Sequence, residues 1–285
     1  MREEFGRNGS YLVVRKLRQE VGKFEAYLKK TAGELKGDPR VPASAVLEEW
    51  IGAKMVGRWK NGTSLVRYPH KPGTASGREE VPGQDMRLRS GETALIPEPG
   101  RKATTANEIA PDNTFLFGRE DPDGLRCPFG AHIRRANPRD SFEPGSQKQL
   151  DISNRHRILR VGRAYVEPKD PTRPAGLLFM CVQSDIERQF EFLQQSWLMG
   201  RNFHGLVDEA DPIVGCGGDR IMTVPTSNGP LRLRSLNEFV SLEGGAYFFL
   251  PGRAAVRMLV QGSVKAAKSI DYSGTMASQD LLPAE

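Results

Sequence analysis

Cysteine is scarce in this chain of 285 residues, which contains only Cys127, Cys181 and Cys216. An odd number, with no C-x-x-C pair and no metal-site spacing, argues against a disulfide framework and against a cysteine-bound metal ion. Reduced thiols are typical of the cytoplasm, where we therefore expect the protein to reside.

Long apolar runs are missing as well. No stretch of 18 apolar residues occurs, so we expect neither a transmembrane helix nor a membrane partner. The first residues lack the charged-then-apolar layout of a signal peptide, and no internal repeat or low-complexity tract is present. These absences favour an ordinary globular protein.

Charges of one sign are not gathered in blocks. The sequence has 41 Lys and Arg against 35 Asp and Glu, a net charge of +6, and the basic residues are spread along the chain. A dispersed excess is weak evidence for nucleic acid, which we do not expect as a partner. An anionic ligand with two carboxylates would explain part of the excess, and a solvated basic surface explains the rest.

The first third of the chain combines strand and helix patterns. Residues 10–17 are rich in strand formers, and 19–28 carry apolar side chains at helical spacing, so we expect a strand that leads into an amphipathic helix. A second helix is predicted over 44–56. From about 72 to 113, Gly, Pro, Ser, Thr and charged residues dominate, which predicts a long loop-rich insertion.

The middle of the chain continues this mixture. Residues 138–154 are polar and are predicted to form a loop. The continuous apolar run 176–183 predicts a buried strand. Asp185 has the position of an N-cap for a helix that continues to residue 199.

The last part of the chain predicts a hairpin and a short helix. The glycine pair 244–245 is a turn signal inside the strand-like segment 239–250. A helix is predicted near 254–260, and a polar tail follows after about residue 262. We therefore expect residues 1–285 to form a single α+β domain with one long insertion.

The segment 127–139, Cys-Pro-Phe-Gly-Ala-His-Ile-Arg-Arg-Ala-Asn-Pro-Arg, places one histidine, His132, between an apolar run and a cluster of cations. The small Gly130 and Ala131 before it would let a bulky group approach the backbone. Imidazole is a natural axial ligand of haem iron, and guanidinium groups are natural partners of carboxylates. The alternative is a core histidine with satisfied hydrogen bonds. The remaining histidines carry no motif; His70 and His204 are interpreted as surface residues and His156 as structural.

This segment resembles the proximal-histidine motif of dye-decolorizing (DyP-type) haem peroxidases. Several other segments resemble the family in the same order: 8–13, 55–59, 156–163, 176–179 and 244–248. The resemblance implies a ferredoxin-like antiparallel sheet with helices, of the dimeric α+β barrel superfamily. It also implies that the chain is the second, haem-binding domain of the family's two.

The resemblance assigns roles to several residues. His132 would bind the iron of haem b (iron protoporphyrin IX), while its other ring N–H donates to a partner that the sequence does not identify. Arg160 matches the distal arginine, whose charge stabilises the departing peroxide oxygen. Leu177 and Phe179, spaced i, i+2 on one side of a strand, match apolar residues of the distal pocket, although core packing explains them equally well.

Two further arginines, Arg134 and Arg139, are candidates for contacts with the haem propionates; simple surface charge is the alternative. The family's G-x-x-D-G motif, which carries its distal aspartate, does not occur in the sequence. The segment 118–122 comes near it but ends in Pro122 and lies in the wrong place. We therefore expect the first domain and its aspartate to have no counterpart here.

The reaction that the resemblance implies is the oxidation of small aromatic or phenolic donors by hydrogen peroxide. The alternative is a haem-binding or interaction module without efficient turnover, such as a gene fragment or one half of a split protein. A third hypothesis is a ferredoxin-like domain without haem. For a domain of this kind we expect self-association, or a partner chain that supplies the missing domain.

Overall fold

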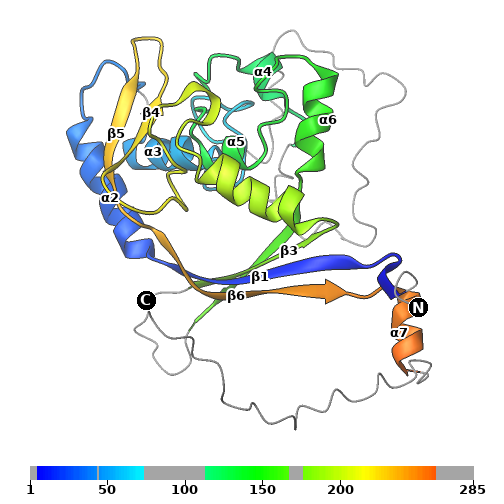
Figure 1. The fold of residues 1–285 in the computed structure, drawn as a ribbon. Helices are drawn as coiled ribbons and strands as arrows, with labels where there is room; N and C mark the ends of the chain where they lie inside the picture. The colour runs from blue at the N-terminus through cyan, green and yellow to red at the C-terminus, as the bar shows by residue number, and fades with distance from the viewer. Residues whose placement is uncertain (1–4, 44, 74–112, 167–175, 261–285) are drawn as a thin grey trace, which may run out of the picture.

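The structure is a computed structural model that describes residues 5–43, 45–73, 113–166 and 176–260 (Figure 1). Nearly all of the predicted loop-rich insertion and the whole predicted tail after residue 262 lie outside the described residues. Within the described ranges, no helix is both long enough and apolar enough to cross a membrane.

The main sheet has four antiparallel strands in the order β2-β3-β1-β6. The strands are β1 (Ser10–Gln19), β2 (Leu159–Tyr165), β3 (Gly176–Gln183) and β6 (Val240–Leu250). The first and third strands in chain order lie at the centre, with helices between the first and second and between the third and fourth, which is the ferredoxin-like arrangement. The predicted fold class is confirmed, and among the described residues the sheet stays open rather than closing into a barrel.

Helices cover one face of this sheet (Figure 1). The helical elements are α2 (Val21–Glu34), α3 (Leu47–Val56), α4 (Phe117–Glu120), α5 (His132–Ala136), α6 (Gln147–Arg155), η1 (Ile186–Glu191), η2 (Leu193–Leu198), η3 (Phe203–Gly205) and α7 (Arg253–Val260). A separate antiparallel pair, β4 (Arg220–Val224) and β5 (Leu231–Leu236), packs with α2 and α3. We call the helix-covered side of the four-stranded sheet the inward face and the other side the outward face.

Three apolar clusters hold the helices in place. One is formed by Leu193, Trp197, Leu198 and Phe203, and the other two differ in size. The larger one joins α2, α3 and the β4–β5 pair, around the fully buried Trp50, Ile51 and Met55. The smaller one lies on the inward face, where Val13 and Cys181 are buried beneath Phe190 of η1. The helix that follows Asp185 is confirmed, because the Asp185 carboxylate accepts from the Arg188 N–H at 2.9 Å.

The prediction of a loop over 138–154 was wrong in its second half, where α6 forms. The Ser146 hydroxyl caps this helix by accepting from the Gln149 N–H at 3.3 Å. The only fully buried residue of α6 is Ser153, which donates to the Arg139 carbonyl at 2.6 Å. The helix is thus anchored by a polar contact and carries no apolar stripe by which it could be recognised.

The predicted hairpin at Gly244–Gly245 was also wrong, since β6 runs through both glycines without a turn. Gly245 lies opposite Arg15 of β1. A Cβ atom at Gly245 would lie 2.7 Å from the Val14 carbonyl oxygen and 3.1 Å from Arg15 Cδ. The glycine therefore permits a close approach between strands rather than a reversal of the chain.

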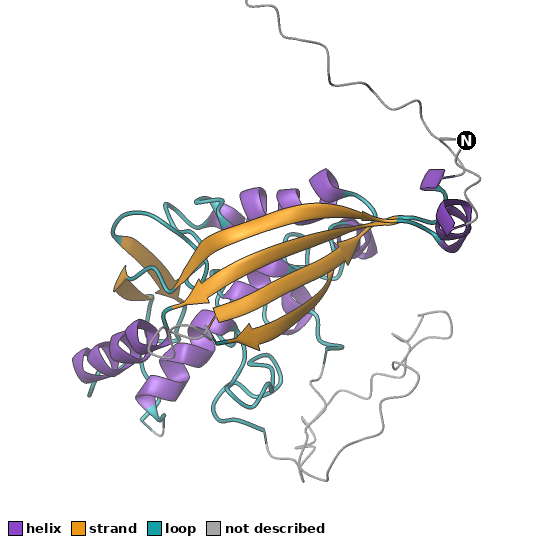
Figure 2. Ribbon diagram, turned by 90° about the horizontal axis from the view of Figure 1, so that it is seen from below, coloured by secondary structure: helices purple, strands orange, loops and turns teal. Residues whose placement is uncertain are grey.

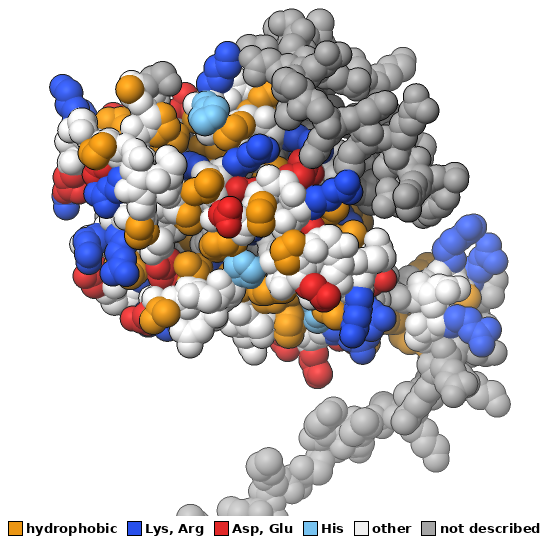
Figure 3. All heavy atoms as spheres, turned by 90° about the horizontal axis from the view of Figure 1, so that it is seen from above, with side chains coloured by type: hydrophobic (Ala, Val, Ile, Leu, Met, Phe, Trp, Pro, Cys, Tyr) orange, Lys and Arg blue, Asp and Glu red, His pale blue; other side chains and the backbone are white. Residues whose placement is uncertain are grey.

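The surface agrees with the dispersed charge of the sequence. On the face seen in Figure 3, basic and acidic side chains are interspersed rather than gathered in one block. Such a surface explains the net positive charge by solvation, as the sequence predicted for most of the excess.

Candidate functional site

His132 begins the short helix α5, which packs on η2 on the helical side of the sheet (Figure 1). Its side chain is 28% exposed. Its Nδ1 atom lies 2.9 Å from Oδ2 of Asp211, whose side chain is fully buried. Asp211 is therefore the partner that the sequence could not identify.

The geometry fixes which ring nitrogen is free. The other carboxylate oxygen of Asp211 accepts from the N–H groups of Ile213 and Val214, both at 2.9 Å. An ionised carboxylate only accepts, so Nδ1 of His132 must carry the hydrogen of this bond. Among the described residues, Nε2 has no hydrogen-bond partner, and it is the atom that a ligand can reach.

The pKa values of the pair move in opposite directions. Burial lowers the pKa of His132, but the charge and hydrogen bond of Asp211 outweigh it, so that the pKa is raised. Burial raises the pKa of Asp211, but the charge and hydrogen bond of His132 and the backbone N–H groups outweigh it, so that the pKa is lowered. The result is an ionised aspartate that makes the imidazole more basic.

Two buried arginines hold the segment that carries Asp211. Arg220 donates from Nη1 to the Asp211 carbonyl at 2.9 Å. Arg135, three residues after His132, donates to the carbonyls of Trp197 and Gly200 at 2.8 and 2.9 Å, and also to that of Glu209. The chain around Asp211 is therefore tied to the same short helix that bears His132.

The sequence predicted none of these supporting contacts. Asp211 is followed by Pro212 and then by two residues whose N–H groups can donate back to its carboxylate, which is a typical Asx-turn sequence. That signal identifies the turn but not its contact with His132, because the two residues are 79 positions apart.

The sheet brings the predicted distal residues together. Arg160 pairs with Cys181 across β2 and β3, and Phe179 follows two residues before Cys181. Directly opposite residues share a face and alternate residues return to it, so Arg160, Phe179 and Leu177 all lie on the inward face. The positive charge of Arg160 also acts against protonation of His132 and so lowers its pKa, although Asp211 outweighs this effect.

Apolar contacts define the surroundings of these strand residues. The Phe179 and Phe190 ring centroids are 6.2 Å apart. Leu177 lies against Gly162, where an added Cβ would be only 2.9 Å from Leu177 Cδ1. Arg160, Phe179 and Leu177 thus present a cation, an aromatic ring and an aliphatic side chain on the inward face.

Arg134 does not face this space. It is fully buried, and its guanidinium donates to the Asp121 carboxylate at 3.1 Å, the Cys127 carbonyl at 2.7 Å and the Ser141 hydroxyl at 3.0 Å. The geometry argues against the predicted propionate contact. It also shows that Asp121 is a structural partner of Arg134. Asp121 is the acidic residue of the segment 118–122, whose sequence partly resembles the missing G-x-x-D-G motif.

Arg139 is also occupied by its own chain. Its guanidinium donates to the carbonyls of Asn113 and Phe115 and lies 4.0 Å from the centroid of the Phe115 ring. This arrangement holds Asn113 and Phe115 against Arg139. It likewise argues against the predicted contact with a propionate.

The remaining histidines play structural parts. His156 donates from Nδ1 to the Arg188 carbonyl, 2.6 Å away, and stacks on Phe192 with the ring centroids 4.0 Å apart. His204 is half-buried beside Phe129 and Phe142, so the prediction of an ordinary surface residue was wrong. His70 is exposed. Among the described residues, no three His, Cys, Asp or Glu side chains gather as a site for a free metal ion.

The chain as a whole is similar in sequence to several known peroxidases. No protein-family model matches the chain. "Peroxidase 2" of Mycetinis scorodonius is 28% identical over 281 residues, covering 90% of this chain and 47% of the relative. "Multifunctional dye peroxidase DyP2" of Amycolatopsis sp. is 29% identical and covers 88% of this chain and 49% of the relative. The chain thus spans about half the length of the curated relatives that it matches.

Solved structures give the same result. The DyP-type peroxidase of Anabaena sp. superimposes with a TM-score of 0.62 at 28% identity, covering 88% of this chain and 46% of that one. A variant of the dye-decolorizing peroxidase from Pleurotus ostreatus gives a TM-score of 0.64 at 28% identity, covering 89% and 51%. In sequence and in fold, this chain is therefore related to the DyP-type peroxidases along nearly all of its length and corresponds to about half of each of them.

Proposed function

We propose that residues 1–285 form the haem-binding domain of a DyP-type peroxidase, which oxidises small aromatic or phenolic donors with hydrogen peroxide. One observation carries the proposal: the Nδ1 atom of His132 is engaged by the buried Asp211 while Nε2 has no hydrogen-bond partner among the described residues. The names of the relatives, which are peroxidases and dye peroxidases, support it. Three free cysteines also favour a reducing, cytoplasmic location.

The residues present fit haem b. A histidine that would hold haem iron needs one free nitrogen and a second nitrogen held by a carboxylate or carbonyl, as His132 has. Leu177 and Phe179 of the inward face would supply the apolar surface that a porphyrin requires. When bound, haem supplies the redox chemistry by which peroxide is activated.

The chain's own residues would contribute orientation and charge. His132 would hold the iron through Nε2, and Asp211 would make it a stronger electron donor, which favours cleavage of the O–O bond. Arg160 would stabilise negative charge on the departing oxygen. An arginine is always protonated, so it cannot move the proton between the two peroxide oxygens.

That proton transfer needs a base within hydrogen-bond reach of the peroxide. The sequence has no G-x-x-D-G motif to supply it. We therefore propose slow turnover for this chain alone. The alternative function, a haem-binding or interaction module without efficient turnover, follows from the same observation.

Haem titration tests the proposal. The full chain is reconstituted with hemin, and absorption spectra are recorded for the wild type, His132→Ala and His70→Ala. We expect one haem per chain with a histidine-ligated spectrum in the wild type and in the exposed-histidine control, and loss of both in His132→Ala. Circular dichroism shows whether each variant is folded.

Two results would contradict the assignment. A histidine-ligated spectrum in His132→Ala would mean that another residue holds the iron, and a wild type without haem would favour the haem-free domain. Peroxide-dependent oxidation of a phenolic dye by the loaded chain then separates a peroxidase from a binding module.

A further inference from the structure

The inward face carries a second cation, Arg15, which the proposed function does not use. Arg15 lies on β1, between Phe179 of β3 and Gly245 of β6. Its guanidinium carbon is 5.0 Å from the centroid of the Phe190 ring. Within the described part of the chain, no carboxylate forms an ion pair with it. A half-buried arginine in this condition is a candidate for binding an anion.

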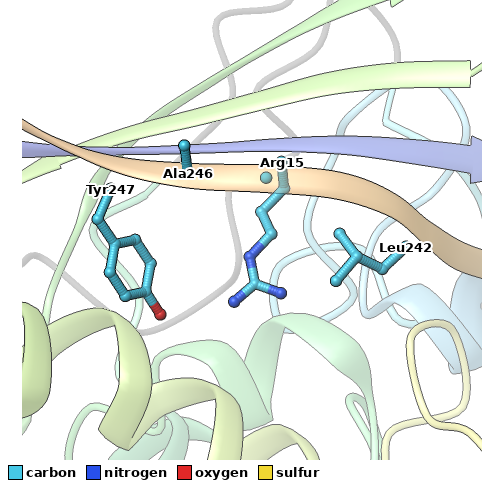
Figure 4. A pocket seen from close by; sticks show the side chains of 5 residues that line it. Arg15, Leu242, Ala246 and Tyr247 are labelled. Atoms are coloured by element: carbon cyan, nitrogen blue, oxygen red, sulfur yellow. The ribbon is translucent and has the colours of Figure 1, made fainter. Parts of the chain in front are cut away.

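A cavity of about 270 Å³ opens beside Arg15. Figure 4 shows the side chains of Arg15, Tyr247 and Leu242 pointing from the strands into the same space, whereas Ala246 points to the other side of the sheet. The Tyr247 hydroxyl donates to the Glu191 carboxylate at 2.9 Å. The same hydroxyl also interacts with the Arg15 guanidinium, which lowers the pKa of Tyr247 against the larger raising effects of burial and Glu191. The cavity therefore combines one guanidinium with an aromatic and an aliphatic wall.

Gly245 explains how Arg15 reaches this position. An added Cβ at Gly245 would lie 3.1 Å from Arg15 Cδ, tighter than ordinary van der Waals contact. Because Gly245 has no side chain, the aliphatic part of Arg15 can pass over β6 at this position, and its guanidinium can pack against Phe190. The neighbouring strands thus hold the fork in a defined place before any ligand arrives.

We propose that Arg15, Tyr247 and Leu242 form a binding site for a planar aromatic molecule that carries a carboxylate. The guanidinium fork matches a carboxylate in two parallel hydrogen bonds, and the ring and the aliphatic side chain match a flat apolar body. Two sources share this chemistry. One is a free aromatic acid; the other is a propionate of haem held by His132, and this second source rests on the proposed function.

Equilibrium binding of 2-naphthoate to the haem-free full chain tests the site, with 2-naphthamide as the uncharged analogue. We expect the naphthoate to bind more tightly than the amide. In Arg15→Leu its affinity should fall about 10- to 100-fold, the range of a lost charge-assisted hydrogen bond. Arg163→Leu removes the same charge from the outward face of β2 and should leave binding unchanged.

Competition with hemin identifies the source. If hemin displaces naphthoate from the wild type, the site takes a haem carboxylate; if naphthoate binds the loaded chain equally well, it takes a free acid. The haem-free titration does not depend on His132, so a failure of the proposed function leaves it intact. Equal binding of naphthoate and naphthamide, or equal binding by the wild type and Arg15→Leu, would overturn the proposal. Should Arg15→Leu fail to fold, Arg15→Lys keeps the charge without the fork and should weaken binding.

Discussion

The two faces of the four-stranded sheet are built by the same strands but are covered very differently. On the inward face, Val13 and Cys181 are fully buried beneath Phe190. On the outward face, Leu159 is 73% and Phe248 48% exposed. Figure 2 looks onto the outward face, and no described helix crosses the middle of it.

The distribution of charge differs from what coverage alone predicts. A sheet with one solvated face normally has its apolar residues inside and its polar residues outside. Here the half-buried Arg15 and the exposed Arg160 lie on the inward face, while apolar side chains fill much of the outward one. The inward face is therefore suited to a charged ligand, and the outward face to association with another apolar surface.

The largest expected effect is a loss of reaction rate when Arg160 is removed from the inward face. In the haem-loaded chain, Arg160→Leu should slow the reaction with hydrogen peroxide about 10²- to 10³-fold, because one fixed donor to the developing oxyanion is lost. Stopped-flow absorption measures this rate. Arg163→Leu, which removes a charge from the outward face of the same strand, should react like the wild type. Equal rates in the two variants would mean that another arginine lies over the iron.

A smaller effect is expected at Asp211. Asp211→Asn keeps the size of the side chain but removes the charge that raises the basicity of His132. Loss of such a partner typically costs about 10- to 100-fold in metal affinity, so hemin should dissociate faster from this variant. Hemin transfer to an excess of apomyoglobin measures the rate. An unchanged rate would show that the hydrogen bond positions the His132 ring but does not alter its strength as a ligand.

The two faces can also be compared without haem, by the free energy of unfolding of variants on each face. Val13→Ala removes two buried methyl-sized groups from the inward face and should cost about 2 kcal/mol in free energy of unfolding. Val161→Ala on the outward face, where Val161 is 47% exposed, should cost less than about 0.5 kcal/mol. Urea unfolding followed by circular dichroism measures both. Similar costs would indicate that the outward face is packed as tightly as the inward one.

The sequence predicts local features of the fold well and distant contacts poorly. The strand over 176–183 and the cap at Asp185 are confirmed, because strand composition and capping are encoded by neighbouring residues. The pairing of His132 with Asp211 depends on the path of the whole chain, so no local pattern could reveal it.

Arg134 shows how proximity in sequence misleads. It lies two positions after His132 in a helix, and successive side chains there turn by about 100°, so the two point to opposite sides. Its guanidinium is consequently buried against Asp121 and Cys127. Arg15, which is more than a hundred residues away from the motif, lies on the face that the motif approaches, and only strand register places it there.

The smallest expected effect concerns the outward face. A continuous apolar run such as β3 is typical of a strand that is covered on both faces, yet the described residues cover only one. The isolated chain should therefore associate with a second copy through its self-complementary outward face. The double variant Leu159→Lys, Phe248→Lys should weaken association at least about tenfold, since two like charges would meet in the interface. Light scattering over a concentration series measures this, and hemin binding should persist because both residues point away from His132. A wild type that stays monomeric throughout the series would show that this face needs no second copy to cover it.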